Sequence, residues 1–240
     1  HGIGHGLMEY LLVTREDLMN NLPGLVELGL SECREISVGE DELFRCGSAI
    51  YVVLKDWIYL QRIENHYPQF FSPETPYGLC AYAKEEWARG ACIFELSVGL
   101  MAKYGHEETF RILSRVGPVW MDGKYYEEMI KGATEIMGIF KSIEKDKDII
   151  SYCRLLRSDS MQSVCVKSVA LSLLTNGKPG DVQARAISFC SSDSLKPQEQ
   201  AECTAYVHNA TSSESMRSMY QNDWFSRLSS YAKALFHEMW

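Results

Sequence analysis

Two histidines and a glutamate at the start of the chain have the spacing of a metal-binding set. His1, His5 and Glu9 follow one another at intervals of four residues, so a helical segment would carry all three along one side. Two imidazoles one helical turn apart chelate Zn, Cu or Fe, and a carboxylate one turn further completes or orients the set. We therefore expect a metal or cofactor site at His1, His5 and Glu9.

The glycines between these residues leave other interpretations open. Gly2, Gly4 and Gly6 are poor helix formers, each costing about 1 kcal/mol relative to alanine, so their presence needs a reason. Close approach of a ligand or cofactor is one reason. Close packing of another helix, with the histidines hydrogen-bonded in a polar interior, is the second. A copper site using the terminal amine of His1 is the third, and it requires His1 to be the natural N-terminus.

The rest of the sequence adds no catalytic motif. It contains no His-Glu-x-x-His, no Gly-x-Ser-x-Gly and no phosphate-binding glycine loop. Adjacent acidic residues point about 100° apart around a helix, which indicates solvated surface rather than an acid/base pair. These pairs are Glu85/Glu86, Glu107/Glu108 and Glu127/Glu128. His66 and His106 are expected at helix ends or in loops as surface or capping residues, although either could fold back to join His1 and His5 as a third metal ligand. Whether the protein is an enzyme stays open.

Eight cysteines fall into four pairs of nearly equal spacing. Their even number and the absence of Cys-x-x-Cys disfavour a zinc or redox site and favour structural disulfides in a secreted, periplasmic or extracellular protein. Nearest-neighbour pairing is the simplest of the many possible connectivities. The pairs are Cys33/Cys46, Cys80/Cys92, Cys153/Cys165 and Cys190/Cys203, which are 13, 12, 12 and 13 positions apart.

Each cysteine pair brackets a stretch that breaks helices, which predicts a helical hairpin with a disulfide across its neck. The second cysteines are 46, 73 and 38 positions apart, and 73 is close to two units of about 36. This spacing predicts a cysteine-free hairpin in the middle of the chain, with Met129 in the place of the cysteine. An unrelated helical insertion there is the alternative. The predicted necks lie near residues 33–46, 80–92, 116–129, 153–165 and 190–203.

These observations predict an all-α fold over residues 1–240, a single helical-repeat domain. We expect disulfide-stapled antiparallel hairpins stacked like an α-solenoid, with an amphipathic capping helix over 213–240. Ser72-Pro73 and Lys196-Pro197 are typical of helix starts, and Asn176-Gly177 of a helix end. No segment alternates with period two for long enough to predict a strand.

Composition excludes some partners. The net charge is -8 and no Lys/Arg cluster is present, so nucleic acid is not an expected partner. The longest apolar run, Ala49 to Leu54, is about a third of the roughly 20 residues that a membrane helix needs. The chain opens on His1 without an initiator Met, which we interpret as a processed product or a fragment.

Two resemblances accompany these patterns. Repeats of about 36 residues with regular cysteines are similar in architecture to disulfide-bridged Sel1-like repeat proteins, although the glycine-rich consensus and shorter cysteine spacing of that family are absent. The segment from His1 to Met8 resembles a His-Gly-x-Gly-His segment of functionally uncharacterised secreted cysteine-rich helical proteins, in which a Cys-Tyr pair precedes it. That resemblance implies that the chain begins inside a hairpin, and it implies no activity.

Two functions follow as hypotheses. The first is an interaction module that binds a protein or peptide partner, with exposed aromatics such as Trp57, Trp87 or Trp120 as anchors. The second is a metal- or cofactor-dependent enzyme or metal-binding protein that uses the first six residues.

Overall fold

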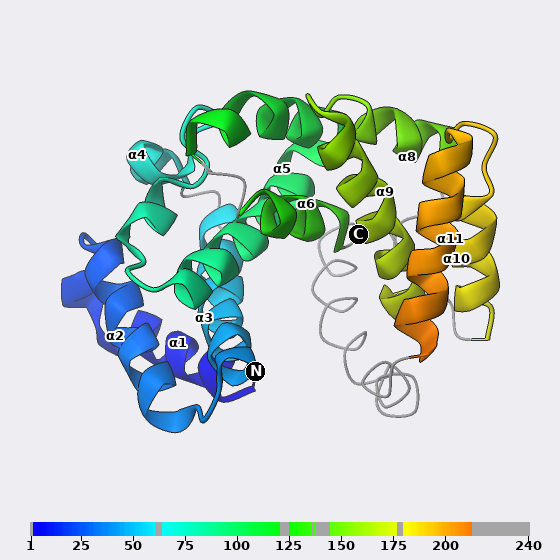
Figure 1. Cartoon of the computed structure of the whole chain (residues 1–240). Coiled ribbons are helices and arrows are strands. Elements are labelled where there is room, and N and C mark those ends of the chain that lie inside the picture. Colours follow the sequence, from blue (N-terminus) through cyan, green and yellow to red (C-terminus); the bar gives the residue numbers. More distant parts are fainter. Residues whose placement is uncertain are drawn as a thin grey trace, which may run out of the picture. The chain divides into compact units, whose positions relative to one another are not determined.

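A computed structural model shows an all-helical protein (Figure 1). It describes residues 2–60, 64–120, 125–135, 137, 145–176 and 180–212, with the backbone alone at Glu16, Leu60 and 117–120. No strand occurs in these residues, as predicted. The α-helices are α1 (Gly2–Thr14), α2 (Leu22–Ile36), α3 (Glu40–Leu60), α4 (Pro68–Phe71), α5 (Glu86–Trp120), α6 (Tyr126–Glu135), α8 (Asp146–Cys153), α9 (Asp159–Asn176), α10 (Val182–Cys190) and α11 (Pro197–Ser212). The 3-10 turns are η1 (Glu16–Leu18), η2 (Glu64–His66) and η3 (Gly78–Tyr82).

The chain divides into two compact units. Unit 1 comprises residues 1–136 and 151–165, and unit 2 comprises residues 137–150 and 166–240. The second boundary falls inside α9, directly after Cys165, so the neck expected near 153–165 belongs to unit 1. The prediction of one continuous repeat domain is not decided by this division and stays a prediction. The capping helix expected over 213–240 and part of the neck expected near 116–129 lie outside the described residues.

All eight cysteines form the predicted nearest-neighbour disulfides. The Cα atoms of the four pairs are 5.7, 5.6, 5.6 and 5.4 Å apart, which is ordinary disulfide geometry. In the same order, the disulfides are Cys33–Cys46, Cys80–Cys92, Cys153–Cys165 and Cys190–Cys203.

The disulfides have a constant place in the helices. In each pair the first cysteine lies in one helix or 3-10 turn, and the second lies in the helix that follows. The second cysteine always stands six positions after the first residue of its helix, which is Glu40, Glu86, Asp159 or Pro197. Each staple therefore joins the start of a helix to the element before it.

Local capping explains where several of these helices begin. The Asn21 side chain accepts a hydrogen bond from Gly24 N at the start of α2, and Ser158 Oγ accepts one from Met161 N at the start of α9. Helix α11 begins at Pro197, as predicted. The helix end predicted at Asn176-Gly177 adjoins residues that lie outside the described ranges.

The expectation of a helix start at Ser72-Pro73 is wrong. Ser72 instead follows the end of α4, and Thr75 N donates to Ser72 O at 3.0 Å, which closes a turn. Pro76 explains the difference, because a proline disfavours the helical conformation of the residue before it, here Thr75.

Helix α5 contains a sharp corner at Gly105. This residue has φ 72° and ψ -179°, a conformation that a side chain would strain. The corner divides α5 into a part that begins at Glu86 and a part that ends at Trp120, with no loop between them. A change of chain direction is therefore built from a single glycine.

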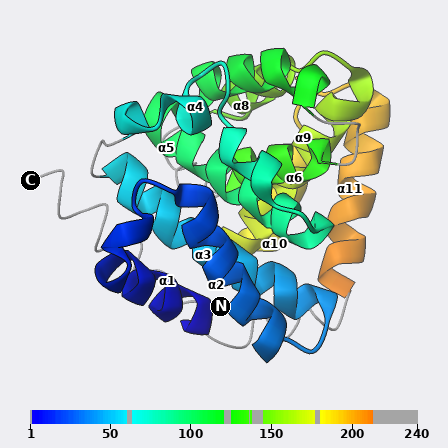
Figure 2. The ribbon, with the colours of Figure 1, turned by 90° about the vertical axis from the view of Figure 1, so that its left-hand side faces the viewer.

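The core of unit 1 is a succession of packed helices. Helix α3 lies between α1 and α5, and α6 packs on α5 (Figure 1 and Figure 2). Ala49, Ile50, Leu54 and Ile58 of α3 are completely buried. Helix α3 is thus the central element of this unit, and it positions the charged groups described below.

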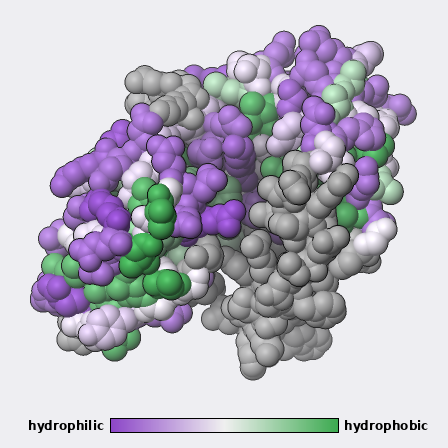
Figure 3. Space-filling view, turned by 60° about the horizontal axis from the view of Figure 1, so that its bottom comes forward, coloured by the Kyte–Doolittle hydropathy of each residue, from purple (hydrophilic) through white to green (hydrophobic). Residues whose placement is uncertain are grey.

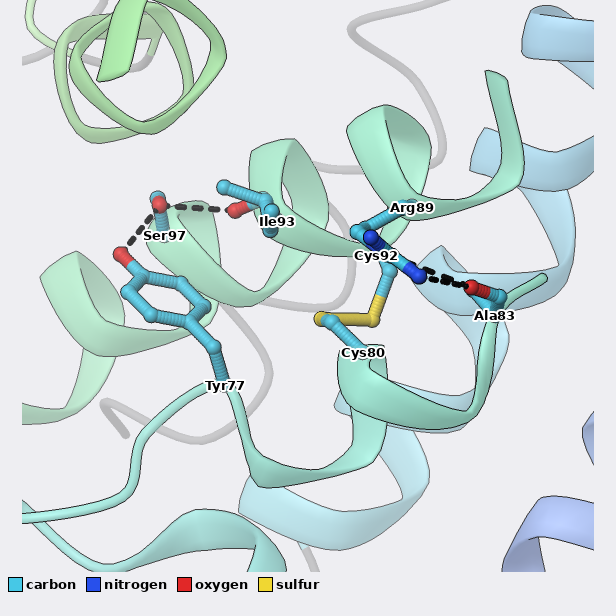
Figure 4. The surroundings of a disulfide bond; sticks show 7 residues. All are labelled: Tyr77, Cys80, Ala83, Arg89, Cys92, Ile93 and Ser97. Carbon is cyan, nitrogen blue, oxygen red and sulfur yellow. Dashed lines mark hydrogen bonds between the residues drawn. A yellow bond between two sulfur atoms is a disulfide. The ribbon is translucent and has the colours of Figure 1, made fainter. Parts of the chain in front are cut away.

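The neck at Cys80 and Cys92 shows how a hairpin is held (Figure 4). Beside the disulfide, the buried Tyr77 hydroxyl lies 2.7 Å from Ser97 Oγ, and Ser97 Oγ donates to Ile93 O. Arg89 donates to Ala83 O at 2.9 Å. Polar contacts on both sides of the disulfide therefore fix η3 against α5.

Unit 2 has its own disulfide and ion pairs. Helices α10 and α11 pack together and are joined by Cys190 and Cys203. Lys167 on α9 contacts Glu202 on α11 at 3.0 Å, and Arg185 on α10 contacts Asp146 on α8 at 2.5 Å. No helix within the described ranges has the length and apolarity to cross a membrane.

Candidate functional site

Helix α1 carries the two described members of the predicted metal set. It is helical from Gly2 to Thr14, so His5 and Glu9 stand one turn apart. His5 is half-buried, whereas Glu9 is exposed. His1 lies outside the described residues. Among the residues that the structure does describe, no group of three or more His, Cys, Asp or Glu residues could hold a metal ion. The metal site therefore stays a prediction.

The surroundings of His5 are charged as well as buried. Burial lowers the pKa of the His5 imidazole, and the carboxylates of Glu9 and Asp56 oppose this shift. Lys55 lowers the pKa further. The imidazole thus faces charges of both signs from α1 and α3, which makes it a polar interior group.

Helix packing accounts for one of the three glycines. A Cβ atom at Gly4 would lie 2.8 Å from Ala49 Cβ and 2.8 Å from Cys46 O, closer than real contacts allow. Gly2 and Gly6 have no such neighbour within 4 Å. The packing interpretation therefore holds at Gly4, where α1 approaches α3, and leaves Gly2 and Gly6 unexplained.

A second group of ionisable residues is buried between α3 and α5. Glu95 on α5 is 4% exposed, and its carboxylate accepts a short hydrogen bond from Ser48 Oγ on α3. Burial raises the pKa of Glu95 to about 7, while Lys55 and Ser48 hold it down. Lys55 is also buried, and its ammonium donates to Asp56 Oδ1 at 2.6 Å.

This group is enclosed by its helices. A substrate would have to separate α3 from α5 to reach the Glu95 carboxylate, because neither Glu95 nor Ser48 is exposed. The arrangement can couple stability to pH, since a carboxylate with a raised pKa is partly protonated near neutrality. We assign it no catalytic role.

The exposed hydrophobic side chains form a different feature. Six large hydrophobic side chains of the described residues are exposed, and five of them belong to α1 and the neck between α2 and α3. They are Ile3 (70% exposed), Tyr10 (64%), Val13 (78%), Ile36 (46%) and Val38 (95%). We call these five side chains the α1-neck surface. Tyr82, on η3, is the sixth.

The two parts of this surface meet at one end of unit 1. Gly4 lies against Cys46, whose disulfide partner Cys33 is three residues before Ile36. Ile3 therefore lies at the same end of the unit as the neck. Figure 3 views this side and shows hydrophobic side chains gathered over the helices of unit 1, on the left-hand part of the face.

The tryptophans proposed as anchors are not part of this surface. Trp57 and Trp87 are half-buried. Trp57 packs near Tyr67, with ring centroids 6.4 Å apart, and Trp87 lies against Gly47. The side chain of Trp120 lies outside the described residues. His66 and His106 pack beside Tyr67 and Tyr152.

The composition of α1 indicates part of the α1-neck surface, although tryptophans were the expected anchors. Residues 2–14 include one acidic residue and no lysine or arginine, so α1 is apolar on both faces. Gly4, Met8 and Leu11 are buried and fill one face only. A helix that is apolar on every side is normally buried on every side. The exposed apolar face of α1 is therefore unusual and indicates a contact surface.

Unit 2 offers a shallow open hollow of about 540 Å³ near the start of α10. Among the lining residues that the structure describes, Asp181 is the single ionisable one. The other lining residues are Gly180, Val182, Gln183, Ala184, Ile187 and Thr211.

Comparison with known proteins gives no further guidance. No protein-family model, curated protein or solved structure matches this chain significantly.

Proposed function

We propose that this chain is a protein-binding module of an oxidising compartment, which binds a protein or peptide partner through the α1-neck surface. The observation that carries this proposal is that five of the six exposed large hydrophobic side chains of the described residues belong to α1 and to the neck, which meet where Gly4 lies against Cys46. Exposed hydrophobic groups that cluster mark interaction sites, whereas single ones need no explanation. The four disulfides support the choice of compartment.

The finer architecture belongs to the same proposal. We propose that the hairpins repeat as a solenoid-like array, similar in architecture to the disulfide-bridged Sel1-like proteins. The constant position of the second cysteine in its helix, at all four necks, supports a repeated unit. The Gly105 corner supports a further, cysteine-free unit, since it divides α5 into two helical parts before α6.

The binding proposal is tested by selecting peptides from a displayed random library on the intact, oxidised protein. Selected peptides are then measured by titration calorimetry against wild type and against Ile3→Ser/Val13→Ser. Each buried aliphatic side chain contributes about 1.5–3 kcal/mol, so the double variant should lose at least roughly tenfold in affinity. Tyr82→Ser is the matched control, because it removes an exposed hydrophobic side chain elsewhere and should leave affinity unchanged. Failure to enrich any peptide, or equal losses in both variants, refutes the proposal.

A metal-binding function is the second candidate, favoured by the helical conformation that places His5 and Glu9 one turn apart. Its test is elemental analysis of protein purified without a histidine tag, beside His5→Ala. If a metal is held, wild type should contain Zn, Cu or Fe in stoichiometric amount and the variant should not. Absence of metal in both, together with a melting temperature that added Zn²⁺ does not change, excludes it.

A further inference from the structure

The neck between α2 and α3 combines exposed hydrophobic side chains with carboxylates. Ile36 and Val38 are exposed there, and four acidic residues, all exposed, surround them in sequence. One exposed basic residue, Arg45, lies in the same stretch. The four acidic residues are Glu35, Glu40, Asp41 and Glu42. We call them the acidic rim.

Helix stabilisation explains only part of the acidic rim. Glu40, Asp41 and Glu42 occupy the first turn of α3, where carboxylates interact favourably with the helix dipole. Glu35 occupies the last turn of α2, where a carboxylate is unfavourable. Helix stabilisation therefore does not account for Glu35, which is adjacent in sequence to the exposed Ile36.

The exposed side chains are held in place. Val38 N donates to Glu42 Oε2 at 2.8 Å, Leu43 N donates to Gly39 O at 2.9 Å, and the Cys33–Cys46 disulfide closes the segment. A rigid neck loses little conformational entropy on binding, so its hydrophobic groups are presented at low cost. Val38 is thus an ordered hydrophobic tip that lies almost entirely in solvent.

We propose that the partner is an amphipathic helix whose apolar side lies along α1 and whose flanking lysines or arginines meet the acidic rim. This inference rests on the proposed function and names the chemistry of its partner. Ile3 and Val13 are ten residues apart on α1, which at 1.5 Å per residue is about 15 Å, or nearly three turns of a partner helix. A partner helix needs apolar residues at i, i+3 or i+4, i+7 and i+10 or i+11 to match that length.

The negative charge of the acidic rim disfavours the other candidate partners. A second copy binding through the same surface would place two acidic rims near one another, because a two-fold interface is self-complementary. Anionic lipid and nucleic acid would meet the same carboxylates with like charge. A basic, apolar protein segment is the occupant that both features of the neck favour.

The test uses three synthetic helical peptides with the same leucine face and with flanking lysine, glutamine or glutamate. Fluorescence anisotropy gives the affinity of each for the oxidised protein, at low salt and at about 0.5 M salt, where charges are screened within a few ångströms. We expect the lysine peptide to bind at least roughly tenfold tighter than the glutamate peptide at low salt, and this preference to shrink at high salt.

The acidic rim is tested by Glu35→Gln/Glu40→Gln/Asp41→Asn/Glu42→Gln. These substitutions keep the side-chain shapes and the oxygen that accepts from Val38 N. They should reduce the lysine preference to about twofold and leave the glutamine peptide unaffected. Glu107→Gln/Glu108→Gln is the matched control, since it neutralises an exposed acidic pair on α5 and should change nothing.

The possible failures are distinguishable. Equal binding of the lysine and glutamate peptides overturns the partner chemistry but leaves the proposed function standing. Binding of none of the three peptides at either salt, in a protein whose circular dichroism shows it folded, counts against both. Concentration-dependent self-association by sedimentation that Val38→Ser abolishes, or binding to phosphatidylserine vesicles, would replace the proposed partner by a second copy or a membrane.

Discussion

Replacement of Glu95 by glutamine should stabilise the protein at neutral and alkaline pH. The Glu95 carboxylate is enclosed between α3 and α5, and burial raises its pKa from 4.5 to about 7. Repulsion from Glu135 and Asp56 adds to the shift, while Lys55 and the hydrogen bond from Ser48 oppose it. Glutamine keeps an oxygen that accepts from Ser48 but carries no charge into the core.

The sign of the pH effect follows from proton binding. Between pH 4.5 and about 7 the folded state binds the Glu95 proton and the unfolded state releases it, so the free energy of unfolding falls as pH rises. At 1.36 kcal/mol per pKa unit, the loss amounts to about 3 kcal/mol once the pH is well above 7. Glu95→Gln removes this titrating group, so the free energy of unfolding of the variant should not fall for this reason over the same pH range.

The assay is chemical unfolding with the disulfides intact, followed by circular dichroism between about pH 5 and 8. The stability of Glu95→Gln minus that of wild type should increase by about 2–3 kcal/mol across this range. Glu74→Gln, on an exposed turn, is the control for the substitution itself and should leave the stability within about 0.5 kcal/mol of wild type. A difference for Glu95→Gln that does not change across the same pH range would refute the reasoning.

Three further predictions concern the same helices. Lys55→Met removes the main charge that lowers the pKa of Glu95, so that pKa should rise further. The free energy of unfolding should therefore fall more between pH 5 and pH 8 in the variant than in wild type, which chemical unfolding at the two pH values measures. Gly4→Ala should cost about 1–3 kcal/mol, because its Cβ would collide with α3, whereas Gly6→Ala meets nothing and should gain up to about 1 kcal/mol. Thermal unfolding of the two variants checks this pair, and equal effects contradict it. Cys80→Ala/Cys92→Ala should lower stability by about 3 kcal/mol, and an unchanged denaturation midpoint would contradict the role given to the staple.

Cysteine spacing predicted much of this fold because a disulfide constrains two Cα atoms to a narrow distance. The nearest-neighbour pairing, of which Cys153–Cys165 is an example, was the simplest of many connectivities, and the structure confirms it. The helix start at Pro197 follows from an equally local signal. The segment after Ser72 was mispredicted because two prolines there compete, and the second disfavours the helix that the first would start.

The candidate site was less accessible to sequence reasoning. His5 was expected to face a ligand, but whether a residue faces a ligand or a neighbouring helix depends on how α1 packs, and α1 packs through Gly4 onto α3. Nothing adjacent to Glu95 in the sequence indicates that it lies opposite Ser48, 47 residues earlier. Long-range packing positions both side chains, and a ligand at His5 stays a prediction.

The same unit buries charge and exposes hydrophobic groups, which is the reverse of what stability alone favours. Lys55 and Glu95 lie in the core, while Val13 and Val38 lie at the surface. The disulfides at the hairpin necks offset the loss of stability, because a disulfide stabilises the folded chain whatever side chains lie around it.

If the exposed hydrophobic side chains had no function, Val38→Ser should be neutral or beneficial in every assay. If they form a binding surface, Val38→Ser should raise solubility, leave the stability within about 0.5 kcal/mol of wild type, and weaken the binding of selected peptides. Loss of binding without loss of stability is the result that separates a functional surface from a tolerated one.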